Sequence, residues 1–188
     1  MTDPASPSWY EICSGGDLLQ GDLIPNCPVY VPLAAGTEDA EGETLSADLV
    51  DVDLVVLTQS CDLEAAKVEV VLGASYQDWP TLREAEDKRG NSAVKGRAFR
   101  EKLSQGDLPS LFLLNKFDGT PPLDWSVVDF RKPYVVPLSV LKETAGLLEA
   151  RLRLVSPYRE YLAQAFARYM MRVGLPVGPK AFLTEGAE

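Results

Sequence analysis

The residues best suited to chemistry lie together in the segment T-Q-S-C-D-L, residues 58–63, directly after a long apolar run. Cys61 and Asp62 are the catalytic candidates there, because backbone N–H groups at the start of a helical turn can stabilise a thiolate. The carboxylates of Asp62 and Glu64 oppose thiolate formation, and the chain has no histidine to act as a general base. We therefore expect Cys61 to be a small buried side chain, and we assign no catalytic residue.

The polar residues of the same segment could bind a ligand without any ionisable group. Thr58, Gln59 and Ser60 carry hydroxyl and amide groups that can contact a peptide or the edge of a base. Such groups more often satisfy the backbone at the end of their own strand. The candidate binding residues are Asp51, Asp53, Thr58, Gln59, Ser60 and Asp62.

Two metal sites are chemically allowed by the residue types. The possible zinc ligands are Cys13, Cys27, Cys61 and Asp62. The possible ligands of Mg²⁺ or Ca²⁺ are Asp51, Asp53 and Asp62. No C-x-x-C pair supports the first site and no recognised loop spacing supports the second, so we predict no metal and no cofactor.

The charge is distributed very unevenly along the chain. Residues 1–66 contain 13 acidic residues and no lysine or arginine, whereas all 18 basic residues follow. An anionic surface favours a protein partner with a basic surface and disfavours nucleic acid through residues 1–66. The alternative is an acidic face that only keeps the protein soluble. In the most basic segment, residues 88–102, cations and acids are interleaved, which favours a surface helix pair over a nucleic-acid patch.

The length of 188 residues predicts one domain over residues 9–176, between a disordered tail (1–8) and a flexible tail (177–188). No apolar run could cross a membrane and the N-terminus does not resemble a secretory signal, so we expect a cytoplasmic protein with no membrane partner. Three cysteines in this length are too few for a disulfide scaffold.

Hydrophobic spacing and turn residues predict a β-rich chain. The expected strands are residues 17–24, 29–33, 48–57, 68–72, 110–117, 125–130, 134–136 and 151–155. The expected helices are residues 82–89 and 94–103 within a charged insert (79–104), 138–148, and a closing amphipathic helix at 157–173. In the strand at 151–155, alternation predicts Leu152 and Leu154 inside and Arg151 and Arg153 outside.

The N-terminal pattern resembles a known family. A strand introduced by Gly16-Asp17-Leu18 or Gly21-Asp22-Leu23, then a long loop and a buried strand at 54–57, resembles the first half of the MazF/PemK-like small β-barrels. The resemblance implies an SH3-like barrel and ribonuclease activity. Those enzymes rely on an arginine just before the buried strand, and this chain has no cation before Lys67. The segment TQSCDL and the closing residues 156–176 also resemble uncharacterised bacterial proteins.

These observations together predict an α+β fold, in which an SH3-like small barrel carries the charged helical insert and a C-terminal amphipathic helix. The function that we expect is that of a non-catalytic, acidic interaction or accessory module. It would act in a bacterial multiprotein system, such as antiviral defence or a toxin–antitoxin pair. The alternative is a MazF-like endoribonuclease that uses later cations, such as Arg151, Arg153 or Arg159.

Overall fold

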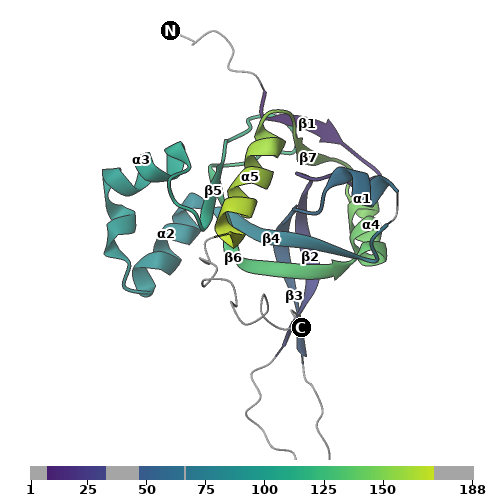
Figure 1. Ribbon diagram of the computed structural model, residues 1–188, viewed down its shortest axis with the longest axis horizontal. Coiled ribbons are helices and arrows are strands. Elements are labelled where there is room, and N and C mark those ends of the chain that lie inside the picture. The colour runs from purple at the N-terminus through teal and green to yellow at the C-terminus, as the bar shows by residue number, and fades with distance from the viewer. Residues whose placement is uncertain (1–7, 33–46, 66, 172–188) are drawn as a thin grey trace, which may run out of the picture.

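Two antiparallel sheets organise the chain, whose computed structural model describes residues 8–32, 47–65 and 67–171 (Figure 1). The larger sheet has the strand order β2-β3-β4-β6-β5, and β1 pairs with β7 in a separate two-stranded sheet. The strands are β1 (Tyr10–Cys13), β2 (Leu23–Pro32), β3 (Ala47–Val56), β4 (Val70–Asp78), β5 (Leu111–Leu114), β6 (Ser126–Pro137) and β7 (Arg151–Leu154). The helices are α1 (Ser60–Glu64), α2 (Trp79–Lys88), the short 3₁₀ helix η1 (Ser92–Lys95), α3 (Arg97–Gln105), α4 (Leu138–Leu147) and α5 (Tyr158–Met170).

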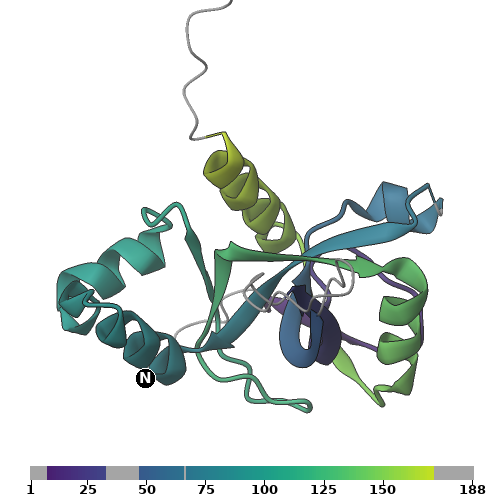
Figure 2. The ribbon, with the colours of Figure 1, turned by 90° about the horizontal axis from the view of Figure 1, so that it is seen from below.

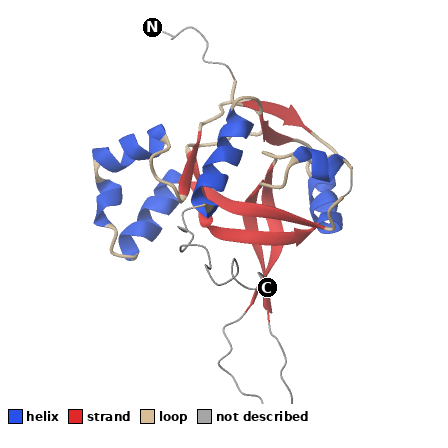
Figure 3. Ribbon diagram, in the orientation of Figure 1, coloured by secondary structure: helices blue, strands red, loops and turns tan. Residues whose placement is uncertain are grey.

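The mixed α+β class is confirmed, but the larger sheet does not close into a barrel over the described ranges. β2 and β5 are its two edges and do not pair with each other. Among the described strands, the four-residue β5 pairs with β6 alone, and helices lie beside it (Figure 3). The expected barrel closure is therefore wrong.

Two apolar cores form on the sheet, because its central strands are apolar on both faces. One core contains Val55 and Phe130 and is covered by α5, whose Leu162 is fully buried. The Phe130 ring lies 5.5 Å from Phe166 and 6.0 Å from Tyr169, so the apolar stripe of this helix packs onto the sheet. The second core is covered by α4 and α1; its fully buried members are Ile24, Cys27, Leu54, Val56, Val71, Leu141 and Ala145.

β2 corrects the expectation of two short strands separated by a turn at residues 25–26. It is one strand with a bulge between Ile24 and Cys27. Asn26 has φ 52° at this bulge, and its N–H donates to Asp53 Oδ1 of β3 at 3.0 Å. A bulge with a residue of positive φ bends the strand without ending it. The strands expected at 125–130 and 134–136 are likewise one strand, β6. The pairing of β6 with β4 shifts register between Ala74 and Ser75 of β4.

The charged insert folds into a small helical lobe, α2, η1 and α3, to one side of the sheet (Figure 2). Its apolar core joins Leu82 and Leu103 to Leu111 and Val127 of the sheet. The helix expected at 94–103 is divided, since η1 ends before Gly96 and α3 begins after it.

A buried carboxylate, Glu86 of α2, fastens the lobe to β6. Arg131 Nη2 donates to Glu86 Oε1 at 2.7 Å, and Arg131 Nε donates to Asp129 Oδ1 at 2.8 Å. Asn91 and Arg89 donate to the same Glu86 carboxylate at 2.9 and 3.0 Å. Burial raises the pKa of Glu86, but these donors, Arg131 foremost, outweigh it and lower the pKa to about 2. We call Glu86, Asp129, Arg131, Asn91 and Arg89 the lobe network.

None of the helices in the described part of the chain has the length and apolar character needed to cross a membrane. The expected terminal tails, apart from Ser8, lie outside the described residues, and so do residues 172–173 of the expected closing helix and 174–176 of the expected domain.

Candidate functional site

One stretch of the acidic first third, the outer half of the β2–β3 hairpin, is only partly covered by neighbouring strands. β3 pairs with β4 only through residues 54–56, so residues 47–53 have β2 as their only strand neighbour among the described residues. We call residues 27–32 and 47–53 the acidic arm. In Figure 1 the arm extends beyond the rest of the sheet.

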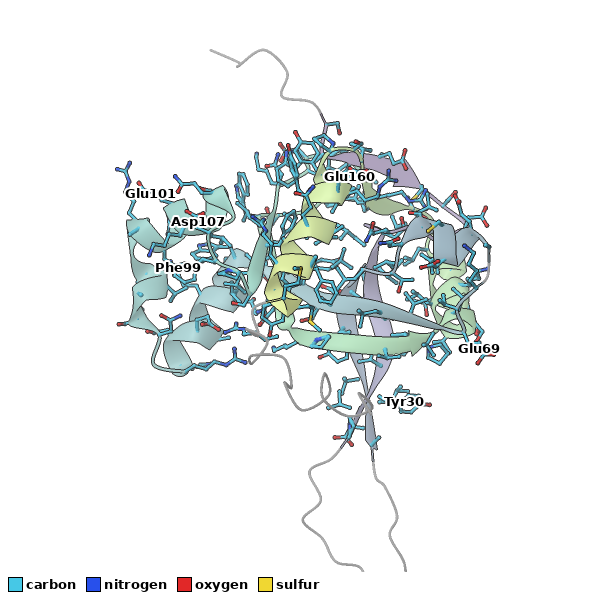
Figure 4. All side chains as sticks on the ribbon, viewed as in Figure 1. Tyr30, Glu69, Phe99, Glu101, Asp107 and Glu160 are labelled. Atoms are coloured by element: carbon cyan, nitrogen blue, oxygen red, sulfur yellow. The ribbon has the colours of Figure 1, made fainter. Side chains whose placement is uncertain are left out.

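One face of the acidic arm combines apolar side chains with carboxylates. Tyr30 and Leu49 are directly opposite each other and are 71% and 60% exposed. Asp51 and Asp53 follow Leu49 at intervals of two along β3, so all three share a face. Figure 4 shows Tyr30 projecting away from the ribbon of the arm. Such a face exposes an aromatic ring beside two negative charges.

The negative charge of the arm is not balanced by ion pairs in the part of the chain that the structure describes. No ion pair within the described residues includes Asp48, Asp51 or Asp53. The negative charge of the arm affects Cys27, at the base of the arm. Burial first, and then the charge of Asp51, raise the pKa of its thiol to about 11. The arm is therefore locally anionic.

Two of the hydroxyls in the predicted binding turn support the backbone. Thr58 Oγ1 accepts from the N–H of Leu72 at 2.8 Å, which links the end of β3 to β4. Ser60 Oγ accepts from the N–H of Gln20 at 3.1 Å. Gln59 is exposed just before α1, and Asp62 lies 3.9 Å from Lys67. Within the described residues no three metal-ligating side chains come together, so neither possible metal site is assembled.

Cys61 is exposed, so the expectation that it is buried is wrong. α1 has only five residues and buries only Leu63, which leaves Cys61 at the surface. The Cys61 thiol donates weak hydrogen bonds to Gln59 Oε1 at 3.7 Å and to Asp62 Oδ1 at 3.8 Å. Both are hydrogen-bond acceptors, and neither can stabilise a thiolate.

Cys61 and Cys27 should therefore label at very different rates. We expect a maleimide at pH 7 to modify Cys61 in the native protein, and Cys27 only after unfolding, since Cys27 is fully buried and its pKa is raised to about 11. Peptide mapping of labelled protein with and without urea measures this. Labelling of Cys27 before Cys61 would contradict the structure.

Two of the arginines proposed for nuclease chemistry are bound in an internal ion network. Arg151 is fully buried: its Nε donates to Asp22 Oδ2 at 3.1 Å and its Nη1 to the carbonyl of Gly15 at 2.6 Å. Arg153 Nη2 donates to Asp22 Oδ2 at 3.0 Å, and Arg153 Nε also donates to Asp22. We call Asp22, Arg151 and Arg153 the Asp22 network. It corrects the prediction that Arg151 points outward, and it prevents Arg151 from reaching RNA.

Sequence reasoning missed the exposed apolar pair of the arm and the Asp22 network. A partial signal for this stretch was present in the sequence: Pro28 and Pro32 on either side of Tyr30 restrict it to an edge strand, although the exposure of the Tyr30 face was not indicated. Asp22 and Arg151 are 129 residues apart, and nothing in the local pattern of either residue indicates the pair.

The class defined by these features is a mixed α+β protein with an open antiparallel sheet and a projecting acidic hairpin. No family model, no curated protein and no solved structure matches the chain.

Proposed function

We propose that the protein is a non-catalytic interaction module that uses its anionic N-terminal third, with the acidic arm at its centre, to bind a basic surface of a protein partner. The observation that carries the proposal is the outer face of the arm, where exposed Tyr30 and Leu49 lie beside Asp51 and Asp53, whose carboxylates form no ion pair within the described residues. Aromatic residues beside complementary charge are typical of protein interfaces.

The arm offers a partner three kinds of contact. Tyr30 and Leu49 can be buried in an apolar depression, and Asp51 and Asp53 can pair with lysine or arginine at its rim. The edge of β3 over residues 47–53, which no described strand covers, can accept a strand from the partner through main-chain hydrogen bonds. A two-stranded ribbon is only marginally stable in water, so a partner would also stabilise the arm.

The non-catalytic assignment is supported by the residues available for chemistry. The chain has no histidine, and the exposed thiol of Cys61 is next to acceptors instead of cations. The proposed setting, a bacterial defence or toxin–antitoxin system, comes from the resemblance of the N-terminal strands and the TQSCDL segment to bacterial proteins.

The experiment is affinity capture of a partner from a native host lysate at low and moderate salt, with a charge-matched pair of variants. D51N/D53N removes both carboxylates of the arm face and keeps an amide oxygen that can accept from Asn26. E143Q/E149Q changes the net charge equally, from −10 to −8, at exposed positions outside the arm. We expect at least a tenfold weaker capture, about 1.4 kcal/mol, only for D51N/D53N.

Three results would overturn the proposal. The first is equal capture by both variants, and the second is capture of no partner at either salt concentration. The third is cleavage of RNA by purified protein, provided that a single arginine substitution abolishes it, which would favour the MazF-like alternative.

A further inference from the structure

A groove that includes no residue of the acidic arm lies among α3, β5 and α5. A pocket of about 870 Å³ is bounded by α5, β5 and the segment after α3, and a second of about 350 Å³ lies between α3 and Trp79. The two pockets adjoin, because both are lined by Leu103, Ser104, Leu113 and Trp125. Figure 1 shows α3 and α5 on either side of β5. We call the combined feature the aromatic groove.

Exposed aromatic rings line the groove at several points. The three tryptophans of the chain, Trp9, Trp79 and Trp125, all contribute to its walls. Trp9 stacks on Tyr158 with ring centroids 4.1 Å apart, and Tyr158 meets Tyr161 edge-on at 6.3 Å. Trp125 and Tyr161 are 45% and 52% exposed. Large aromatic side chains left this accessible in a concave site indicate a ligand with apolar surface.

The groove contains several hydrogen-bond donors without a partner among the described residues. Within the described residues, the indole N–H groups of Trp9 and Trp125 have no hydrogen-bond acceptor, and neither Arg100 nor Arg168 forms an ion pair. Arg100 instead lies over the ring of Trp79 at 5.7 Å. The groove therefore matches a ligand that has apolar surface and many acceptor oxygens.

The charge of the groove is opposite to that of the rest of the protein. Its ionisable residues are Arg97, Arg100, Arg168, Glu101 and Asp107, which sum to +1 on a chain of net charge −10. Arg97 is paired with Glu101 at 2.7 Å, which leaves Arg100 and Arg168 to face one acid, Asp107. Figure 4 places Asp107 and Glu101 on the helical lobe. A ligand with a single negative charge or a few negative charges fits this balance.

We propose that the aromatic groove binds a proline-rich segment of a protein partner, in the polyproline II conformation and carrying at least one aspartate or glutamate. Proline rings pack against tryptophan and tyrosine faces, and the carbonyls of this conformation have no internal hydrogen bonds, so they can accept from the free indoles. The acidic side chain meets Arg100 or Arg168. Single-stranded nucleic acid also stacks on aromatic rings, but the net charge of −10 repels a phosphate at every nucleotide.

The test uses a set of fluorescein-labelled peptides of eight prolines and two glutamates, with the glutamates moved along the set. Binding to the full-length protein is followed by anisotropy and by tryptophan fluorescence, which reports on the groove because all three tryptophans line it. Two other probes separate the classes of ligand: the same peptides with glycine in place of proline, and oligodeoxythymidylate of ten nucleotides.

The variants are chosen from exposed positions, so that folding is retained. Trp125→Ala removes an exposed ring and Arg168→Ala an exposed cation, whereas Arg83→Ala makes the same charge change outside the groove. We expect Trp125→Ala to raise Kd about tenfold or more and Arg168→Ala about fivefold, with no change for Arg83→Ala. D51N/D53N should bind the peptides like the unsubstituted protein, so this proposal and the proposed role of the arm fail independently.

Three results would overturn the proposal. The first is no binding by any peptide of the set at millimolar concentration. The second is equal binding by Trp125→Ala, and the third is tighter binding of the oligonucleotide or of the glycine peptides than of the proline peptides.

Discussion

Replacement of Asp22 by asparagine is expected to lower the free energy of unfolding by about 3–5 kcal/mol, the usual cost of removing one partner of a buried ion pair. Asp22 is the carboxylate that both Arg151 and Arg153 contact, and Arg151 is fully buried. Without that charge, a guanidinium remains buried with only carbonyl oxygens as partners. The same carboxylate accepts from the N–H of Leu19, so the segment before β2 should also loosen.

Urea unfolding followed by tryptophan fluorescence measures this loss. Asp17→Asn is the matched control, because the Asp17 side chain is exposed and the arginines contact the main-chain carbonyl of Asp17. If Asp22→Asn does not fold, the double variant Asp22→Asn/Arg151→Met should recover folded protein, since it removes the buried uncompensated charge as well. A loss below 1 kcal/mol for Asp22→Asn would contradict the importance of the network.

The second large effect is expected at Glu86, which joins the helical lobe to β6. Its pKa is lowered from 4.5 to about 2 in the folded protein, because donors led by Arg131 outweigh the effect of burial. A group whose pKa is depressed on folding stabilises the protein above its unfolded pKa, and this contribution is lost as the pH falls. We therefore expect about 3 kcal/mol of stability at pH 7 to disappear between about pH 5 and pH 2.

Glu86→Gln should remove most of this contribution, so the difference in stability between variant and unsubstituted protein should shrink steadily as the pH falls through that window. Urea midpoints measured from pH 7 to pH 2 give the difference. Glu84→Gln is the control on the same helix, because Glu84 pairs with Lys88 at 2.7 Å at the exposed surface and should change little. A difference that is independent of pH would show that Glu86 acts by packing and not by charge.

The elements of the fold that depend on local pattern were predictable from the sequence. Alternation identified the strand that became β3, and helical spacing from Tyr158 to Phe166 identified α5 and its buried face. The continuity of β2 was not predictable from the sequence, because β2 continues past Pro25 as a single strand through the bulge at Asn26. Proline and asparagine indicate a turn locally, whereas pairing with β3 decides whether the strand ends.

The environment of single side chains was harder to predict than the elements. Alternation placed Arg151 outside because it assumes that one face of a strand meets solvent. β7 instead pairs with β1, and residues 15–22 contribute carbonyls and Asp22 to its arginines. Cys61 shows the opposite error, since α1 is too short to bury a second residue besides Leu63.

The acidic arm and the aromatic groove also differ in how far the sequence indicated them. Asp51 and Asp53 do share a strand face in β3, as the alternation indicated. The aromatic groove had no local signal, because Trp9, Trp79 and Trp125 come from three distant parts of the chain. Only the packing of α3 and α5 around β5 brings their rings together.

Hydrogen–deuterium exchange on the complex with the captured partner tests the central claim most directly. If the acidic arm is the binding surface, amides in residues 27–32 and 47–53 should exchange more slowly in the complex than in the free protein, because the partner covers the arm and can pair with the free edge of β3. The D51N/D53N variant should lose this protection at the same partner concentration. Unchanged exchange in the arm, with protection confined to other segments, would contradict the account.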